Sequence, residues 1–342
     1  MSKDLNVAVV GATGVVGTEA IGLLEERDFP LASLRLVASG RSAGDQISFR
    51  GSSITVEALG SFDFHGIDLV LSAPGASVSL EYVPRAVAAG CLVIDKSSAF
   101  RMDPAVPLVV PEVNRADLAR AAGIIASPNC TSIPLSMVLA PLHREFGLRR
   151  VVVSTYQAVS GAGQKAADEF IGQAVAILNR RPMPLKEFPH QIAFNVLPHV
   201  ETFVEADGGY STEETKVRDE TRKILGLPEL RVTATCVRVP VVNGHSESVN
   251  IEFERPVTPA RAREILAAAP GIEVLDSPAE ELYPMPVEAS GGDSVLVGRI
   301  RADDTVESGL NLWLSCDNLR KGAALNAVQI AEVYFDAGRR GA

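Results

Sequence analysis

A glycine-rich turn near the N-terminus lies between an apolar run and a helical segment, and it restricts the possible folds more than any other feature of the chain. Leu5–Val10 predicts a buried strand, and Val15–Glu26 predicts a helix. In the turn at residues 11–17, glycines let the backbone approach a pyrophosphate, and the helix start supplies free N–H groups. The G-x-x-G-x-x-G spacing also suits a tight turn that binds nothing. Strand, turn and helix together favour a dinucleotide-binding unit.

Strands and helices alternate through the first third of the chain. Further strands are expected at residues 34–38, 68–72, 92–95 and 124–126, with a helix at 78–89. Such alternation is typical of a parallel sheet that is covered on both faces. The predicted fold class is therefore α/β, and it begins with a Rossmann-type parallel-sheet domain.

The pattern changes near residue 130. A long strand is expected at 150–159, and strands that alternate in the manner of an antiparallel sheet are expected at 231–241, 248–254, 294–300 and 309–315. A last helix at 319–337 is apolar on one side, so we expect it to pack back on the first domain. We therefore divide the chain into a Rossmann domain, 1–129 with 318–342, and an α+β domain, 130–317.

Composition and charge exclude several classes of protein. The chain has 342 residues and a net charge of −10, which argues against a general binder of nucleic acid or of anionic membranes. The first apolar run is too short for a signal peptide, and no apolar stretch approaches about 18 residues, so we expect a cytoplasmic protein. The four cysteines form no C-x-x-C pair, so we expect neither a metal site nor a disulfide framework.

The segment after the second expected strand bears on the choice of cofactor. An NAD-specific site usually has Asp or Glu there, to bind the ribose 2′-hydroxyl. This chain has Ser39, Arg41 and Ser42 instead. A guanidinium with flanking hydroxyls suits a 2′-phosphate, which predicts NADP as the cofactor. An arginine in a solvated loop would have the same appearance in the sequence.

One cysteine lies at a strand-to-helix turn. Cys130 follows an apolar run and precedes an apolar helix that begins near Ile133. The dipole at a helix N-terminus lowers the pKa of a thiol and so favours the nucleophilic thiolate. Cys91, Cys236 and Cys316 lie inside apolar segments, as inert buried cysteines do. Position alone leaves both interpretations open for Cys130.

Several short motifs follow one another along the chain. They occupy residues 11–17, 97–101, 127–131, 157–163, 238–240, 244–247 and 317–323. Any one of them is weak, but the ordered set, from about residue 5 to residue 336, resembles the aspartate-semialdehyde dehydrogenase family. The resemblance implies that the second domain is the catalytic and dimerisation domain.

The resemblance also implies residue roles. Cys130 would attack the aldehyde, Gln157 would orient the intermediate, and His245 would be the general base. The implied substrate ligands are Arg101 for phosphate, Asn129 beside the nucleophile, Arg238 for the carboxylate, Glu213 for the amine, and Lys216 for phosphate or substrate. The implied cofactor-binding residues are Gly11, Thr13, Gly14, Val15, Val16, Gly17, Ser39, Arg41, Ser42, Ser160, Gly161 and Asn318. Without the resemblance, Glu213 and Lys216 would be interpreted as a surface ion pair.

The implied reaction is the NADP-dependent, phosphorylating oxidation of L-aspartate 4-semialdehyde to L-4-aspartyl phosphate through a cysteine thioester. Inorganic phosphate would be the second substrate, the protein would be a homodimer, and the pathway would lead to lysine, diaminopimelate, threonine and methionine. Two positions depart from the family pattern. Lys96 stands where the family usually has Asn, and Pro134 lies near a position that usually bears an amide. These departures bear on local hydrogen bonding and on no catalytic role.

Three alternatives remain at this point. N-acetylglutamyl-phosphate reductase shares the thioester route, but an acetylated amine does not need a carboxylate partner such as Glu213. A thioester reductase would use coenzyme A in place of phosphate, and the cations Arg101 and Lys216 favour phosphate. A non-catalytic relative that keeps only the fold should have lost Cys130 or His245, and both are present.

Overall fold

The computed structural model describes residues 4–340, with side chains for residues 4–336. The chain forms two compact units, Met1–Asn129 with Ala323–Ala342, and Cys130–Gly322. In this division the chain returns to the first unit at residue 323, whereas the division predicted from the sequence has the return at 318. Within the described part of the chain, no helix is both long and apolar enough to cross a membrane.

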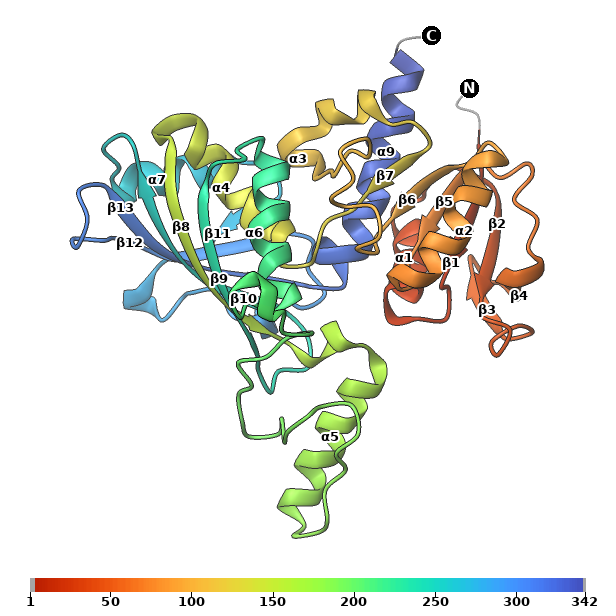
Figure 1. The fold of residues 1–342 in the computed structure, drawn as a ribbon, viewed down its shortest axis with the longest axis horizontal. Helices are drawn as coiled ribbons and strands as arrows, with labels where there is room; N and C mark the ends of the chain where they lie inside the picture. Colours follow the sequence, from red (N-terminus) through yellow and green to blue (C-terminus); the bar gives the residue numbers. More distant parts are fainter. Residues whose placement is uncertain (1–3, 341–342) are drawn as a thin grey trace. The chain divides into compact units, whose positions relative to one another are not determined.

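The first unit contains a seven-stranded sheet with the order β3-β4-β2-β1-β5-β6-β7 (Figure 1). All neighbouring strands run parallel except β3, which pairs antiparallel with β4. The strands are β1 (Leu5–Val10), β2 (Leu31–Ala38), β3 (Gln46–Phe49), β4 (Ser52–Ala58), β5 (Leu69–Ser72), β6 (Leu92–Asp95) and β7 (Ile124–Ala126). The order reverses at β1, and ligands of such sheets bind beyond the carboxyl ends of the strands at this switch point.

Two layers of helices cover the first sheet. The helices are α1 (Val15–Glu26), α2 (Ala76–Ala88), α3 (Pro111–Asn114) and α9 (Leu325–Arg340). Val7 and Val9 of β1 join a core with α1 and α9, whereas Ala8 and Val10 join a second core with α2. Successive side chains of a strand point to opposite faces, so β1 is buried on both faces. Burial on both faces explains why its sequence is a nearly continuous apolar run.

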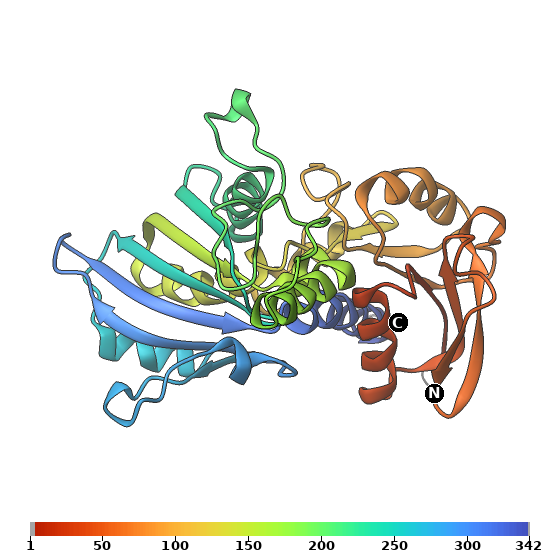
Figure 2. The same cartoon turned by 90° about the horizontal axis from the view of Figure 1, so that it is seen from below.

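The second unit contains a six-stranded mixed sheet with the order β11-β12-β13-β10-β8-β9, which can be followed by colour in Figure 2. Its strands are β8 (Leu148–Gln157), β9 (Arg231–Arg238), β10 (His245–Phe253), β11 (Ile272–Val274), β12 (Val295–Ala302) and β13 (Gly309–Cys316). The three central pairings are antiparallel, but β9 and β11 pair parallel at the two edges. The long chain between β8 and β9 permits this, because a parallel pair needs a crossover of a dozen residues or more.

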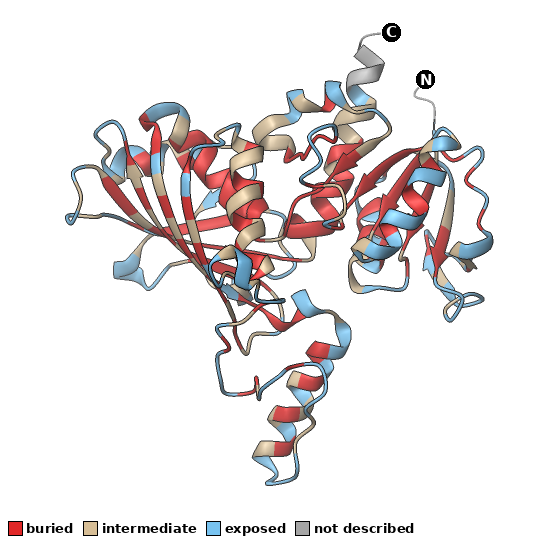
Figure 3. Cartoon of the chain, viewed as in Figure 1, coloured by how far each residue is buried: buried red, intermediate tan, exposed pale blue. Residues whose placement is uncertain are grey.

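Helices cover one face of the second sheet and leave the other partly open. The helices of this unit are α4 (Ser132–Phe146), α5 (Gln164–Leu178), α6 (Thr212–Leu225), α7 (Pro259–Ala267) and α8 (Pro286–Ala289). α4, α6 and α7 pack on the strands, whereas α5 projects from the sheet (Figure 1). Along β8, buried residues such as Thr155 and Gln157 alternate with half-buried or exposed ones (Figure 3).

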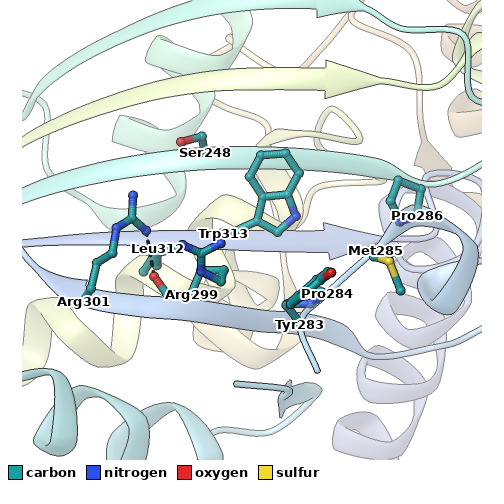
Figure 4. Close-up of a pocket in the computed structure, with 9 residues that line it drawn as sticks. All are labelled: Ser248, Tyr283, Pro284, Met285, Pro286, Arg299, Arg301, Leu312 and Trp313. Carbon is teal, nitrogen blue, oxygen red and sulfur yellow. Dashed lines mark hydrogen bonds between the residues drawn. The ribbon is translucent and has the colours of Figure 1, made fainter. Parts of the chain in front are cut away.

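The open face of this sheet carries aromatic and basic side chains. Tyr156 is 37% exposed, and its ring lies 4.9 Å from the ring of Trp313, centroid to centroid. A pocket of about 340 Å³ opens beside Trp313 and is lined by Arg299 and Arg301, among others (Figure 4). Arg301 donates to the carbonyl oxygen of Arg299 across 2.8 Å.

Several elements differ from the sequence-based expectation. The hairpin of β3 and β4 was not expected, because its strands are short and largely polar. β10 begins at His245 rather than at residue 248. The last α-helix begins at Leu325, since the Asp317 side chain accepts bonds from the N–H groups of Leu319 and Arg320 and a π-helical turn follows.

Candidate active site

The glycine turn of the first unit has the shape that a bound pyrophosphate needs. Gly11 has a φ of +83°, which favours glycine. A Cβ at Gly17 would lie 2.1 Å from the carbonyl oxygen of Gly11, so only glycine fits there. Gly14 caps α1 without a side-chain hydrogen bond, which leaves the first backbone N–H groups of the helix for an anion. These features fit a dinucleotide cofactor.

The end of β2 lies beside this turn. Thr13 Oγ1 donates to Ser42 Oγ across 3.3 Å, and Ser42 N donates to Ser39 O across 3.0 Å. Arg41 is exposed within the short turn between Ser39 and Ser42. The segment from which an NADP preference was predicted therefore contacts the glycine turn.

Cys130 begins the second unit. It lies two residues before Ser132, the first residue of α4, and it is half-buried. A charge on Cys130 raises the pKa of both Arg238 and Cys316, so the thiol lies close to the ends of β9 and β13. A Cβ on Gly322 would lie 3.2 Å from the Cβ of Cys130, so the nucleophile is packed against the chain there.

Three other predicted residues lie in a row across the sheet. Gln157 ends β8 and pairs in register with Arg238, which ends β9. On the other side of β8, β10 begins at His245, whose register partner on β13 is Cys316. All lie on the buried face, with His245 and Gln157 each 1% exposed. The strands thus hold an amide, a guanidinium and an imidazole at one end of the sheet, the end at which Cys130 lies.

The peptide unit of Ala158 connects two of these side chains. Its N–H donates to Nδ1 of His245 across 3.0 Å, and its carbonyl oxygen accepts from Arg238 across 2.8 Å. A Cβ on Gly161 would lie 3.0 Å from both His245 Nε2 and Arg238 Nη1, so glycine leaves the room that both side chains occupy. Burial lowers the pKa of Arg238, and nearby Glu213 and Cys130 oppose that effect.

Glu213 lies behind Gln157 at the start of α6. Its Oε1 accepts from Gln157 Nε2 across 2.9 Å, and its other oxygen lies 3.6 Å from Lys216 Nζ. Lys216 also pairs with Glu201. The Glu213 side chain is only 4% exposed. Burial raises its pKa, while Lys216 acts in the opposite direction. The i, i+3 spacing alone suggests a surface ion pair, but its carboxylate is buried, whereas Lys216 and Glu201 stay partly exposed.

Ser160 and Asn318 form a second network. Asn318 Nδ2 donates to Ser160 Oγ across 3.0 Å, and Asn318 Oδ1 accepts from Gly244 N across 2.9 Å. Ser160 Oγ donates in turn to Asn243 Oδ1. These bonds fix the loop that precedes His245, so both residues have a structural task beside the predicted contact with the cofactor.

Arg101 and Asn129 belong to the first unit and are buried there, with 5% and 6% exposure. Arg101 Nε donates to Ser127 O across 3.1 Å, and a terminal nitrogen donates to Lys96 O. Backbone carbonyls therefore orient the guanidinium. Lys96, a departure from the family pattern, contributes its backbone to this contact.

The sequence analysis did not identify several residues of this region. They are Thr155, Ala158, Glu201, Asn243 and Gly322, which contact the predicted residues. Two of them act through the backbone, which no side-chain pattern reveals. Thr155 could have been found from its position two residues before Gln157 on one strand, because both then share a face.

A dinucleotide-binding turn in one unit, and a cysteine with an amide, a guanidinium and an imidazole in the other, define a nicotinamide-dependent oxidoreductase. The chain belongs to the semialdehyde dehydrogenase family. The model of the NAD binding domain of semialdehyde dehydrogenase matches residues 6–121, and the model of its dimerisation domain matches residues 139–321. No group of three or more metal-ligating side chains occurs among the described residues.

Individual relatives agree with this family. Aspartate-semialdehyde dehydrogenase of Aquifex aeolicus (strain VF5) is 51% identical and covers 97% of this chain and 98% of its own. The Bacillus subtilis (strain 168) enzyme of the same name is 48% identical, with 97% and 98% covered. The structure of aspartate semialdehyde dehydrogenase II from Vibrio cholerae complexed with ASA has a TM-score of 0.94 at 43% identity. The match covers 97% of this chain and 98% of that one. A structure of the Candida albicans enzyme with NADP has a TM-score of 0.75 at 27% identity. The match covers 96% of this chain and 98% of that one.

Proposed function

We propose that this protein oxidises L-aspartate 4-semialdehyde to L-4-aspartyl phosphate, with NADP and inorganic phosphate, in the biosynthesis of the aspartate-family amino acids. The observation that carries the proposal is the row of Gln157, Arg238 and His245 at the sheet end where Cys130 lies, with Glu213 behind it. The names of close relatives support the same substrate.

The Cys130 sulfur attacks the aldehyde carbon, and the thiol proton passes to the carbonyl oxygen as the C=O double bond opens, so that a thiohemiacetal with a hydroxyl group forms. His245 donates from Nε2 to the carbonyl oxygen, and we assign to it the hydroxyl proton that leaves in the next step. NADP, when bound, accepts the hydride. Loss of hydride and proton leaves a thioester on Cys130, and splitting the oxidation in this way makes each step easier.

Arg238 and Glu213 recognise the two charged ends of the substrate. A guanidinium binds a carboxylate with two parallel hydrogen bonds, and a buried carboxylate suits an ammonium. Glu213 already contacts Gln157 and Lys216, so an incoming ammonium shares a prepared anionic site. An N-acetylated substrate lacks that ammonium, which argues against N-acetylglutamyl-phosphate reductase activity.

Phosphate then attacks the thioester carbon. The C–S bond breaks, the acyl phosphate leaves, and the Cys130 thiolate is restored. We assign Arg101 and Lys216 to the phosphate, and Asn129 to the positioning of the nucleophile. Two cations can hold a dianion that must approach an acyl group.

The choice of NADP over NAD rests on the end of β2. Arg41 with Ser39 and Ser42 offers a cation and two hydroxyls where an NAD site has an acid. The bond between Thr13 and Ser42 supports a single preformed site for the diphosphate and the 2′-phosphate. The glycine turn, with Val15 and Val16 opening α1, binds the diphosphate, and Ser160, Gly161 and Asn318 are assigned to the nicotinamide end. The cytoplasmic location stays a prediction.

We propose a homodimer that covers the open face of the second sheet. The family description of this unit as a dimerisation domain supports the assembly. Tyr156 and Trp313, partly exposed on a sheet face, have the amphipathic character of interface residues. Replacing Tyr156 by Glu would place a charge in this contact, so light scattering after gel filtration should show more monomer than for the wild type.

Absorbance of NADPH tests the main proposal. With aspartate semialdehyde and NADP, steady formation should require phosphate or arsenate, because the thioester needs an acceptor. Without an acceptor, a burst of about one NADPH per site should leave an acylated chain in the intact mass spectrum, and Cys130→Ala should give neither. Equal steady rates without any acceptor would indicate a hydrolytic aldehyde dehydrogenase. N-acetylglutamate semialdehyde and coenzyme A are the controls for the two related activities.

A further inference from the structure

Thr155 is a buried residue beside the proposed active site that the mechanism above does not use. It precedes Gln157 by two residues on β8, so both side chains lie on the buried face of the sheet. Thr155 has an exposed fraction of 0%. Its Oγ1 donates to Gln157 Oε1 across 3.0 Å. The backbone N–H of Val237 approaches the same hydroxyl at 3.4 Å.

The amide of Gln157 is therefore held at both ends. Thr155 donates to its oxygen, and Glu213 accepts from its nitrogen across 2.9 Å. A flip of the amide would turn its oxygen toward the Glu213 carboxylate, which cannot donate when it is ionised. One N–H of Nε2 and one lone pair of Oε1 remain for other groups. Both contacts thus select one orientation of a side chain that could otherwise adopt two.

The two contacts differ in what substrate binding does to them. Glu213 already pairs with Lys216, and in the proposed function it also receives the substrate ammonium. An ammonium at Glu213 competes with the Gln157 amide for the same carboxylate. The substrate ammonium does not compete for the bond from Thr155, because an ammonium is a donor and cannot accept the proton that this hydroxyl gives to Gln157.

We propose that Thr155 is a positioning residue that keeps the amide of Gln157 in its reactive orientation while the substrate occupies Glu213. This inference rests on the proposed function, in which Gln157 orients the reaction intermediate. Thr155 does not touch the substrate, so its contribution is to turnover and not to substrate affinity.

Thr155→Val tests the proposal, because valine keeps the shape of threonine but lacks the hydroxyl. We expect kcat to fall about tenfold, the scale of one hydrogen bond, with the KM for the semialdehyde changed less than about twofold. Thr155→Ser keeps the donor and should restore kcat. Thr221→Val is the matched control, since Thr221 is also 0% exposed in this unit and its hydroxyl has no hydrogen-bond partner among the described residues.

A double-mutant cycle separates positioning from packing. In a Gln157→Ala background, Thr155→Val should lower kcat no further, because Thr155 acts through Gln157. An equal loss in both backgrounds would overturn the proposal and assign Thr155 a packing role. Thr155→Ala repeats the cycle if the valine variant does not fold. If the wild type oxidises the semialdehyde and Thr155→Val has the same kcat, the inference about Thr155 is wrong while the proposed function stands. If the wild type does not oxidise it, the proposed function fails first.

Discussion

The backbone N–H of Ala158 donates to Nδ1 of His245 across 3.0 Å. A ring nitrogen that accepts a hydrogen bond carries no proton, so a neutral His245 holds its proton on Nε2. This tautomer can donate to an oxyanion. A general base needs the lone pair of Nε2, so the ring proton must move to Nδ1 and the bond from Ala158 must open before His245 accepts the hydroxyl proton. The structure therefore records the resting state of this residue.

The first prediction concerns the two tasks of His245. His245→Asn should lower kcat by roughly 10²–10⁴ through the loss of acid–base catalysis, and it should leave the KM for the semialdehyde nearly unchanged. Steady-state kinetics at saturating NADP and phosphate measure both values. A raised KM with normal kcat would make His245 a binding residue.

The resting tautomer can be measured independently. Nitrogen-15 spectra of the protein labelled at histidine should show Nδ1 of His245 without a proton and Nε2 with one, and the signals are assigned through their loss in His245→Asn. A ring with its proton on Nδ1 in the substrate-free enzyme would contradict the bond from Ala158.

The second prediction concerns the cofactor. Arg41→Asp should weaken NADP through repulsion of the 2′-phosphate and improve NAD relative to it, measured as the ratio of kcat/KM for the two cofactors. Arg120→Asp makes the same charge change at another exposed position of the first unit and serves as the control. An unchanged ratio in Arg41→Asp would show that Arg41 does not contact the phosphate.

The third prediction separates the two anion sites. Lysine keeps the charge of arginine but loses the planar fork, so each Arg→Lys change should cost about 1.5–3 kcal/mol, or roughly 10- to 150-fold in kcat/KM. Arg238→Lys should show this loss for the semialdehyde, and Arg101→Lys should mainly raise the KM for phosphate. Each substrate is varied while the others saturate. A crossed result would mean that the two roles are reversed.

The fourth prediction concerns Glu247, which lies on the buried face of β10 with an exposed fraction of 0%. Among the described residues, neither of its carboxylate oxygens has a hydrogen-bond partner. Burial raises its pKa well above the ordinary value of 4.5. A folded-state pKa above the unfolded one stabilises the fold at pH values below the unfolded pKa, and this contribution is lost as the pH rises toward the folded-state value.

Glu247→Gln removes this titration. The free energy of unfolding of the wild type should therefore fall more between pH 5 and pH 8 than that of the variant, by at most about 1.4 kcal/mol per pH unit, and its midpoint of thermal unfolding should fall with it. Scanning calorimetry at the two pH values measures the difference. Parallel changes in both proteins would mean that Glu247 gains a partner or water that keeps its charge stable.

The alternation of apolar runs and helical segments was enough to predict five strands of the first sheet, namely β1, β2, β5, β6 and β7. Runs such as Leu5–Val10 are buried on both faces, and that leaves a clear signal in the sequence. The hairpin of β3 and β4 carries little apolar surface, so it leaves no clear signal in the sequence. The parallel pairing of β8 with β9 depends on a crossover of many residues, whose path the local pattern does not contain.

The candidate site was predictable where side chains recur in motifs. Gln157, Arg238 and His245 come from separate segments, and the structure brings them to one end of a sheet. Their partners were not predictable, because the backbone of Ala158 acts through its position alone. The burial of Glu213 was also not predictable, because an i, i+3 ion pair on a charged helix is usually exposed to solvent.

The contact between Cys130 and Gly322 has a geometric consequence. Cys130 is the first residue after the chain leaves the first unit, and Gly322 is the last before it returns. The two points at which the chain passes from one unit to the other are therefore both at or next to Cys130. A Cβ on Gly322 would lie 3.2 Å from that of Cys130. Any side chain larger than that of glycine at position 322 would therefore press on the residue that carries the thiol, so this glycine protects the place of the sulfur.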